Sequence, residues 1–447
     1  MLLETTVGAN RMVRGNGSRA ELRARWAALS GPTRDRAIGD HPLASPALPR
    51  QDESVKFILS FLLLAIVPLV AQAEPPSSSP VIPGTGLEAF AAKAEAGDKV
   101  HVAFLGGSIT QNASGHSRRV PAALETLYPK AEFAFTRAGL GSTCSTSGAF
   151  RWRDHLLSKG AIDLLVVEFA VNDDQDAAHA PRECIRGMEG IVRGVLVENP
   201  DTGIVMIHYL NESMLAKTRA GEVPVSVAAH QKVADHYGIP VADVMLAVAQ
   251  AVESGDYDWK KYGGTHPGAF GYEVASQLVM DVVQASLAAA GTRPESLPAP
   301  LDAASYVSGG FIDPAAARPT GEWTRGHPSR EVLGKGGFRE DYASWPLLRS
   351  STAGDSLKLH FEGTVIGAWV LAGPDAGIVE TRIDGDEWTE TQLFHRHSGG
   401  LHYPRSVVFG AGLAEGKHVL ELRISAEQPK GSSGTTASIL QFLAEKH

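Results

Sequence analysis

The feature that most constrains the fold is a regular alternation of short apolar runs and amphipathic segments between residues 87 and 290. Runs rich in β-branched and aromatic side chains occur at 100–105, 132–136, 163–170, 203–210 and 240–244. Amphipathic stretches, such as 181–198 and 225–237, lie between them. Strands that alternate with helices in this way form a parallel sheet covered by helices on both faces. We therefore predict a three-layer α/β/α domain over residues 87–291, with a five-stranded parallel sheet.

The pattern changes after the Pro-rich stretch TRPESLPAPLDAA, which starts at Thr292. Short runs separated by Gly, Asp and Pro turns follow at 356–362, 364–371, 377–383, 406–409 and 417–425. The pair Asp384-Gly385 after one of these runs is a hairpin signal. We predict a linker over residues 292–320 and an all-β, jelly-roll-like sandwich domain over residues 321–447.

The N-terminal region carries an export signal. Residues 56–73 read KFILSFLLLAIVPLVAQA, with a Lys, an apolar run and a small-x-small cleavage site. This pattern predicts a signal peptide at 55–73 and an exported (periplasmic or extracellular) protein. The apolar run is too short to predict a stable membrane anchor after cleavage. The Pro/Ser-rich residues 74–86 predict a flexible lead-in.

Residues 1–54 contain eight Arg, no Lys and no clear apolar periodicity. We expect that translation starts at Val55, which would make residues 1–54 a mis-called extension; a genuine basic extension is the alternative. Residues 1–73 contribute a net charge of +3, so the −9 of the whole chain becomes about −12 from Glu74 onward. This acidity argues against nucleic acid or an anionic membrane surface as a partner.

The chain has only two cysteines, Cys144 and Cys184. An oxidising exterior would permit a disulfide between them, and two buried free thiols are equally compatible with the sequence. Two cysteines cannot supply a four-Cys zinc site, and the chain has no H-E-x-x-H run. We therefore expect no metal and no organic cofactor.

Four residues stand where a predicted strand ends or where a helix is about to begin. Ser108 lies in G-G-S-I-T, directly after the first strand VHVAFL. Gly141 follows the second strand, Asn172 follows the third, and His266 precedes the last helix in G-G-T-H-P. Each of these alone is typical of an ordinary turn, cap or loop residue. Together they place a hydroxyl, an imidazole and amide donors at the same edge of the sheet, where functional residues gather.

The order and spacing of these blocks resemble the SGNH/GDSL hydrolases, in their G-G-S-I-T variant, over roughly residues 98–290. The resemblance implies that Ser108 is a catalytic nucleophile and His266 its base. It also implies an oxyanion hole formed by the backbone N–H groups of Ser108 and Gly141 and by the side-chain amide of Asn172. These residue types suit the chemistry, because a Ser hydroxyl needs an adjacent base and an oxyanion needs preorganised donors.

One position departs from the family pattern. The family commonly has an Asp three residues before the His, and this position is Gly263 here. We favour a Ser–His dyad. The alternative is another orienting carboxylate, for which the candidates are Asp258, Asp256, Asp173 and Glu168.

Two other groups of residues in the β domain attract attention. His395, His397 and His402 with Tyr403 lie in one stretch, where an exposed loop is favoured over a metal site or a substrate-facing edge. Four Trp residues of the same domain could stack on sugar rings, although core filling is the usual role of Trp in a sandwich.

We therefore predict a serine esterase that works through an acyl-enzyme, with a small-molecule or polysaccharide ester as its substrate. Export and the appended sandwich favour a carbohydrate O-acetyl esterase. The alternatives are a lipase or thioesterase, and a non-catalytic carbohydrate-binding protein with a degenerate hydrolase domain.

Overall fold

The computed structural model describes residues 79–157, 160–289 and 291–445. The expected extension 1–54 and signal peptide 55–73 lie outside the described residues. Within the described part of the chain, no helix has both the length and the apolar character needed to cross a membrane.

The first domain is built on a mixed sheet whose strands are ordered β1-β6-β5-β4-β2-β3. Its parallel strands are β2 (Lys99–Gly106), β3 (Glu132–Gly139), β4 (Leu164–Glu168), β5 (Gly203–Ile207) and β6 (Val241–Ala242). Strands β4 and β5 are buried along their whole length, which explains why they read as continuous apolar runs. The predicted parallel sheet is confirmed.

A sixth strand was not expected. Strand β1 (Val81–Ile82) pairs antiparallel with β6 at the edge of the sheet. The Pro/Ser content of residues 74–86 predicted a flexible lead-in, but two adjacent β-branched residues in it continue the sheet. The carbonyl of Pro80 accepts a hydrogen bond from the N–H of Asp243, which fixes the start of this strand.

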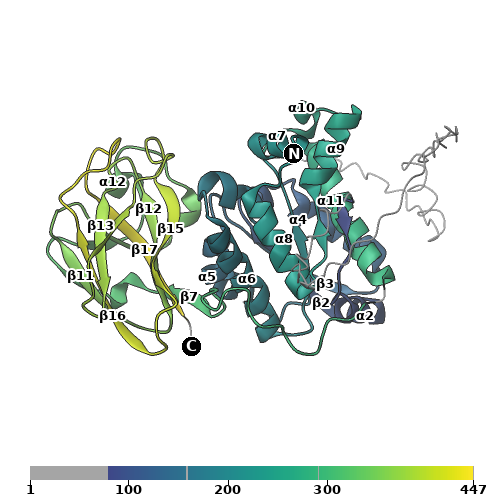
Figure 1. Cartoon of the computed structure of the whole chain (residues 1–447), viewed down its shortest axis with the longest axis horizontal. Helices are drawn as coiled ribbons and strands as arrows, with labels where there is room; N and C mark the ends of the chain where they lie inside the picture. Colours follow the sequence, from purple (N-terminus) through teal and green to yellow (C-terminus); the bar gives the residue numbers. More distant parts are fainter. Residues whose placement is uncertain (1–78, 158–159, 290, 446–447) are drawn as a thin grey trace, which may run out of the picture. The chain divides into compact units, whose positions relative to one another are not determined.

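Helices cover both faces of this sheet (Figure 1). One face is packed by α2 (Glu88–Ala96), α4 (His116–Leu127), α9 (Val244–Ser254) and α11 (Ala269–Ala288). The other face is packed by α5 (Ser145–Leu156), α6 (Pro181–Glu198) and α8 (Val225–Tyr237). The three-layer α/β/α architecture is therefore confirmed.

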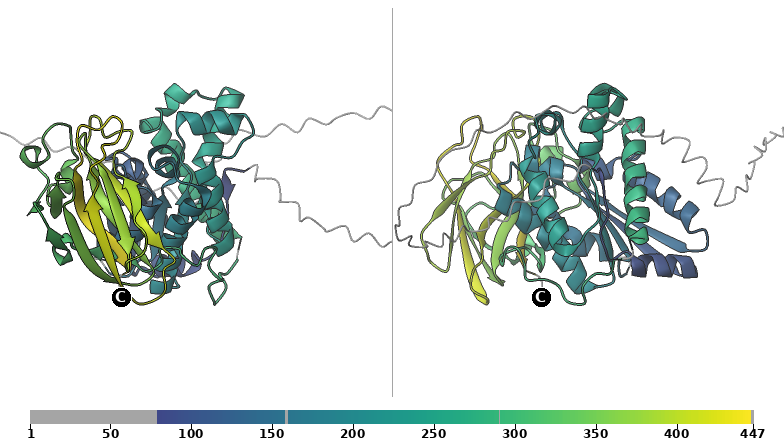
Figure 2. Two further views of the ribbon diagram at one scale, coloured as in Figure 1. Left: turned by 60° about the vertical axis from the view of Figure 1, so that its left-hand side comes forward. Right: turned by 45° about the vertical axis from the view of Figure 1, so that its right-hand side comes forward.

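The second domain is a sandwich of two antiparallel sheets, seen in green and yellow in Figure 2. One sheet contains β7 (Gly309–Ile312), β9 (Thr324–Gly326), β10 (Leu347–Ser350), β12 (Val365–Ala372), β15 (Tyr403–Ala411) and β17 (Ala437–Glu445). The other contains β8 (Arg318–Thr320), β11 (Ser356–Glu362), β13 (Ile378–Ile383), β14 (Thr389–Gln392) and β16 (Lys417–Ile424). A separate apolar core fills the space between the sheets.

The turn between β13 and β14 contains the predicted hairpin residues. Asp384 and Gly385 have φ values of 53° and 87°, which is the left-handed conformation that such turns require. Two further strands, β7 and β8, lie within the range 292–320 that the sequence indicated as a linker. Both are too short to produce a recognisable alternation.

The segment between the domains is fixed to α6. The buried carboxylate of Glu189 accepts hydrogen bonds from the backbone N–H groups of Leu301 and Asp302 and from the hydroxyl of Ser305. The apolar core on this face of the sheet also continues into the sandwich, where Trp369 and Leu443 belong to the same cluster as Trp152. The two domains therefore share a hydrophobic core.

Candidate active site

Ser108 is the first residue of α3 (Ser108–Gln111), directly after β2, and its side chain is half-buried. The preceding turn has no space for side chains. A Cβ at Gly107 would lie 2.1 Å from Oδ1 of Asn172. The Gly-Gly pair thus allows the strand to turn into the helix while the Asn172 amide approaches the backbone.

His266 lies in the loop between α10 (Trp259–Tyr262) and α11, and it is exposed. Its Nε2 is 2.7 Å from Oγ of Ser108. This is a hydrogen-bond distance, so the imidazole is placed to accept the hydroxyl proton. The structure brings together the two residues that the sequence proposed as nucleophile and base.

The loop that carries His266 excludes a side chain at the position where the family commonly has Asp. Gly263 has a φ of 108°, and a Cβ there would lie 2.1 Å from the backbone N of Gly268. That N–H donates to the carbonyl of Tyr262 and closes the loop. An Asp at position 263 would therefore require a different loop.

The structure does not bring any of the proposed orienting carboxylates to His266. Asp258 caps α10 by accepting from the N–H of Lys261, and Asp256 accepts from the hydroxyl of Ser254. Asp173 is buried and accepts from Ser145 and His230. Among the residues that the structure describes, no carboxylate makes a hydrogen bond or ion pair with His266. The geometry is that of a Ser–His dyad.

The proposed oxyanion donors have different partners in the structure. The N–H of Ser108 begins a helix, where the first N–H groups have no intrahelical acceptor. Asn172 lies in the π-helical turn η2 (Asn172–Asp176), where its Nδ2 donates to Asp176 at 2.6 Å and its Oδ1 faces Gly107. The N–H of Gly141 donates to Oε1 of Gln111 at 3.0 Å, so a substrate carbonyl oxygen must displace Gln111 to use this donor.

Glu168 stabilises the turn that leads from β2 to Ser108. It ends β4 and is fully buried, and its Oε1 accepts from the N–H of Gly107 at 2.9 Å and from the hydroxyl of Thr110 at 2.5 Å. Burial raises the pKa of Glu168 to about 7, against the opposing effect of the hydrogen bond from Thr110. The sequence suggested Glu168 only as a carboxylate for His266. A charged residue inside the apolar run DLLVVEFA was the signal of its buried role.

Residues of the second domain border the site, which the sequence did not predict. The guanidinium of Arg339 donates from Nε and Nη2 to Oγ of Ser142, and Nε2 of Gln111 donates to Asp341 at 3.0 Å. The stretch expected to be an exposed loop is partly buried instead, with His402 and Tyr403 inside the protein, and Nε2 of His395 lies 2.7 Å from the carbonyl of Asp176. These contacts depend on how the domains pack, for which a single sequence has no signal.

Cys144 and Cys184 are both buried and not bonded to each other. Of the two possibilities that the sequence left open, the structure has the free thiols.

A serine hydroxyl paired with an imidazole, at the C-terminal end of a parallel strand and beside amide donors, is the arrangement of a serine hydrolase. The comparison with known families agrees. Residues 104–274 match the model of the GDSL-like lipase/acylhydrolase family. The chain carries a domain of this family and is a carboxylic ester hydrolase of the SGNH type.

The structure is also similar to two crystal structures of "a two-domain esterase (CEX) active on acetylated mannans", one of them co-crystallised with mannopentaose. Both are 20% identical to this chain, with a TM-score of 0.65. The match to the mannopentaose complex covers 82% of this chain and 97% of the esterase chain. The match to the other crystal structure covers 83% of this chain and 99% of the esterase chain. At this identity the likeness establishes a shared two-domain fold. No curated protein matches the chain.

Proposed function

We propose that the chain is an exported carbohydrate O-acetyl esterase that works through an acyl-enzyme on Ser108. The observation that carries the catalytic part is the 2.7 Å contact between Oγ of Ser108 and Nε2 of His266. Export is supported by the signal-like residues 55–73. The substrate class is supported by the fold shared with an esterase active on acetylated mannans.

The proposed reaction has two halves. In the first, Oγ of Ser108 attacks the acetyl carbonyl while Nε2 of His266 takes its proton, and the imidazolium then protonates the departing sugar oxygen. In the second, His266 removes a proton from water, which attacks the acyl-enzyme, and acetate leaves as Ser108 regains its proton. In both halves the oxyanion accepts hydrogen bonds from Ser108, Gly141 and Asn172.

Within residues 79–445 as described, His266 has no carboxylate partner, which fits its exposure. A buried imidazolium would need an anion beside it, because desolvation disfavours the charged form. An exposed imidazolium is stabilised by water. We therefore propose that solvent replaces the third triad member in this enzyme.

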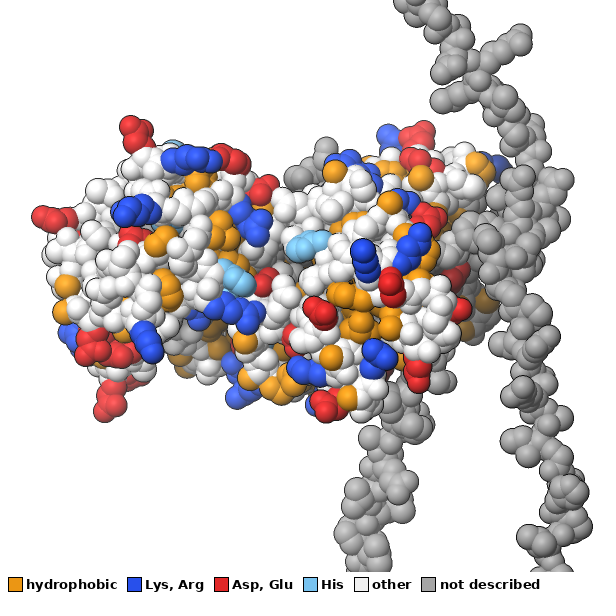
Figure 3. Space-filling view, turned by 90° about the horizontal axis from the view of Figure 1, so that it is seen from above, with side chains coloured by type: hydrophobic (Ala, Val, Ile, Leu, Met, Phe, Trp, Pro, Cys, Tyr) orange, Lys and Arg blue, Asp and Glu red, His pale blue; other side chains and the backbone are white. Residues whose placement is uncertain are grey.

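The groups that border Ser108 suit a sugar substrate better than a long acyl chain. Gln111, Arg339 and Asp341 present amide, guanidinium and carboxylate groups, which can hydrogen-bond sugar hydroxyls. On the face seen in Figure 3, basic and acidic side chains are interspersed rather than gathered by sign. Such a face suits an uncharged polysaccharide better than a polyanion.

Acetate release from acetylated mannan and acetylated xylan tests this proposal, together with a series of nitrophenyl esters of increasing chain length. We expect acetyl esters to be the best substrates, acetate to be released from at least one polysaccharide, and Ser108→Ala to abolish release. A preference for long acyl chains would identify a lipase instead. A folded protein that cleaves no ester would support the non-catalytic binding protein.

A further inference from the structure

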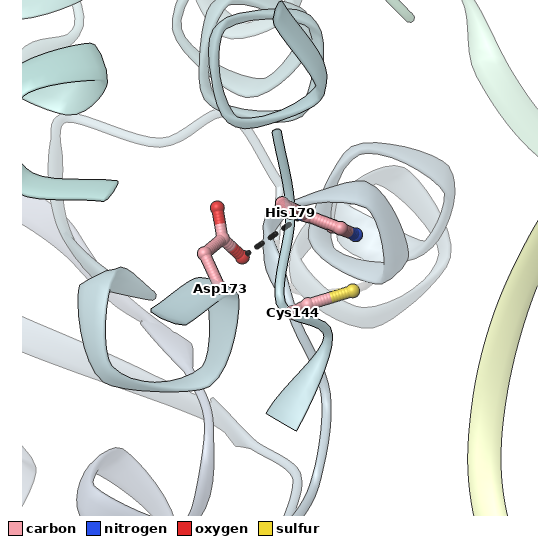
Figure 4. Close-up of side chains that lie close together, drawn as sticks. All are labelled: Cys144, Asp173 and His179. Carbon is pink, nitrogen blue, oxygen red and sulfur yellow. Dashed lines mark ion pairs between the residues drawn. The ribbon is translucent and has the colours of Figure 1, made fainter. Parts of the chain in front are cut away.

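A cluster of three potential metal ligands lies close in sequence to the proposed oxyanion residues. The proposed mechanism uses none of the three. Sγ of Cys144, a carboxylate oxygen of Asp173 and a ring nitrogen of His179 all lie within 4.8 Å of one another. They come from separate segments (Figure 4): Cys144 precedes α5, Asp173 lies in η2, and His179 is two residues before α6. This cluster could not be recognised in the sequence, because its members have no metal-binding spacing.

One of these ligand atoms has no hydrogen-bond partner in the described part of the chain. Nδ1 of His179 is buried and makes no hydrogen bond within the described part of the chain. It lies 3.6 Å from Oδ1 of Asp173, which is too long for a hydrogen bond. Leaving a buried polar atom unpaired costs free energy, and a metal ion between these atoms would remove that cost.

Hydrogen bonds already hold the carboxylate of Asp173 in a fixed orientation. Asp173 is fully buried, and its Oδ1 accepts from the N–H of Ser145 at 2.8 Å. Its Oδ2 accepts from the hydroxyl of Ser145 at 2.6 Å and lies 2.9 Å from Nε2 of His230. Hydrogen bonds of this kind fix metal-binding carboxylates in known sites, and they leave Oδ1 a second lone pair for an ion.

The cluster is also accessible from a cavity. Cys144 and His179 line a cavity of about 290 Å³, which would supply an entry path and a position for a water ligand.

We propose that Cys144, Asp173 and His179 bind one divalent transition-metal ion, and that Zn²⁺ fits this donor set best. Zn²⁺ accepts sulfur, nitrogen and oxygen ligands at about 2.0–2.3 Å in a tetrahedral arrangement, with water in the fourth position. Such bond lengths bring ligand atoms to about 3.5 Å from one another, so a small side-chain rotation closes the cluster around the ion. This proposal departs from the sequence-based expectation of no metal.

The ion would connect two parts of the active site. Cys144 is three residues after Gly141, and Asp173 is adjacent to Asn172. An ion held by both segments would fix the positions of two proposed oxyanion donors. This consequence rests on the proposed function, whereas metal binding itself does not.

The test measures metal on the full chain by mass spectrometry after gel filtration, and by Co²⁺ titration. We expect about one Zn²⁺ per chain and a thiolate-to-Co²⁺ absorption band. His179→Gln and Cys144→Ser should weaken Zn²⁺ binding by about 100-fold or more. Cys184→Ser is the matched control, since Cys184 is not one of the three clustered ligands and its Sγ donates to the carbonyl of His179 at 3.9 Å; this variant should bind Zn²⁺ like the unaltered chain.

The proposal is overturned if the folded chain, judged by circular dichroism, binds neither ion at micromolar concentration. It is also overturned if the Co²⁺ band persists in Cys144→Ser or is lost in Cys184→Ser. Ser108→Ala should bind metal normally. Failure of the proposed esterase function would therefore leave the metal result unaffected, and the two failures can be told apart.

Discussion

At the scale of single residues, the proposed active site combines a Ser108–His266 contact with a His266 that has no carboxylate partner among the described residues. The hydroxyl and the imidazole are in contact, and the Gly263 loop excludes the carboxylate that the family pattern would place there. Removal of a triad carboxylate from an enzyme built around it costs orders of magnitude in rate. An active site that lacks a triad carboxylate should not depend on any nearby acidic side chain.

This view predicts that Asp256→Asn and Asp258→Asn each keep kcat within about threefold of the unaltered enzyme, whereas loss of a true triad carboxylate costs about 10⁴-fold. Asp258→Asn should also leave the cap of α10 intact, since Asn caps as well as Asp does. Steady-state kinetics with an aryl acetate checks both variants. A loss of 100-fold or so in either one would assign the third member of a triad.

Asn172→Ala tests the oxyanion hole. We expect kcat to fall by about 10²–10³-fold with KM little changed, because the lost donor acts on charge that develops only in the transition state. Asn112→Ala, which removes an amide that accepts only from the nearby N–H of Ser114, is the control and should retain activity. Equal kcat values for Asn172→Ala and the control would remove Asn172 from the mechanism.

At the scale of elements, the turn between β2 and α3 depends on a buried carboxyl group from β4. The pKa of Glu168 is about 7 in the folded chain, whereas its ordinary value is 4.5. Between pH 4.5 and about 7, Glu168 is therefore mostly protonated in the folded state and mostly ionised in the unfolded state. This stabilisation is complete below pH 4.5 and is lost as the pH rises through about 7. Its size is roughly 3 kcal/mol.

Glu168→Gln should flatten this pH dependence. The amide keeps an acceptor oxygen for Gly107 and Thr110 but cannot ionise. Urea unfolding between pH 4.5 and 7.5 or so should show a falling free energy of unfolding for the unaltered chain and a smaller slope for the variant. Parallel slopes for the two proteins would show that Glu168 does not titrate in this range.

The sequence predicted some of these elements and could not predict others. Strands β2 to β5 were recognisable because Gly and polar residues bound their apolar runs. Strand β17 was missed, since ASILQFLAE is buried on almost every residue and lacks the alternation that separates a strand from a buried helix. The contacts of Gln111, Arg339 and His395 arise from domain packing, which local patterns do not encode.

At the scale of the whole molecule, the hydrolase domain and the sandwich share one apolar core. Trp369 is fully buried in the sandwich and belongs to the cluster that contains Trp152 and Phe150 of α5. Ser147 and Ser406 also join the domains, with their hydroxyl oxygens 2.8 Å apart. The domains should therefore unfold together rather than in separate steps. The boundaries 87–291, 292–320 and 321–447 remain predictions.

Trp369→Ala should lower the free energy of unfolding by about 3–5 kcal/mol, because it opens a cavity in the shared core. Trp388→Ala is the control: the guanidinium groups of Arg382 and Arg423 lie 4.7 and 4.2 Å from the centre of its ring, and Trp388 is not part of that core, so the loss should be smaller. Calorimetry should show one transition for the unaltered chain. Two separated transitions, with only one shifted by Trp369→Ala, would contradict a shared core.

Labelling with a fluorophosphonate, followed by intact-mass measurement and peptide mapping, is the sharpest test of whether Ser108 is a nucleophile activated by His266. We expect one adduct per chain on Ser108, slower labelling in His266→Ala, and no adduct in Ser108→Ala. A folded chain that forms no adduct, or an adduct that persists in Ser108→Ala, would contradict this assignment.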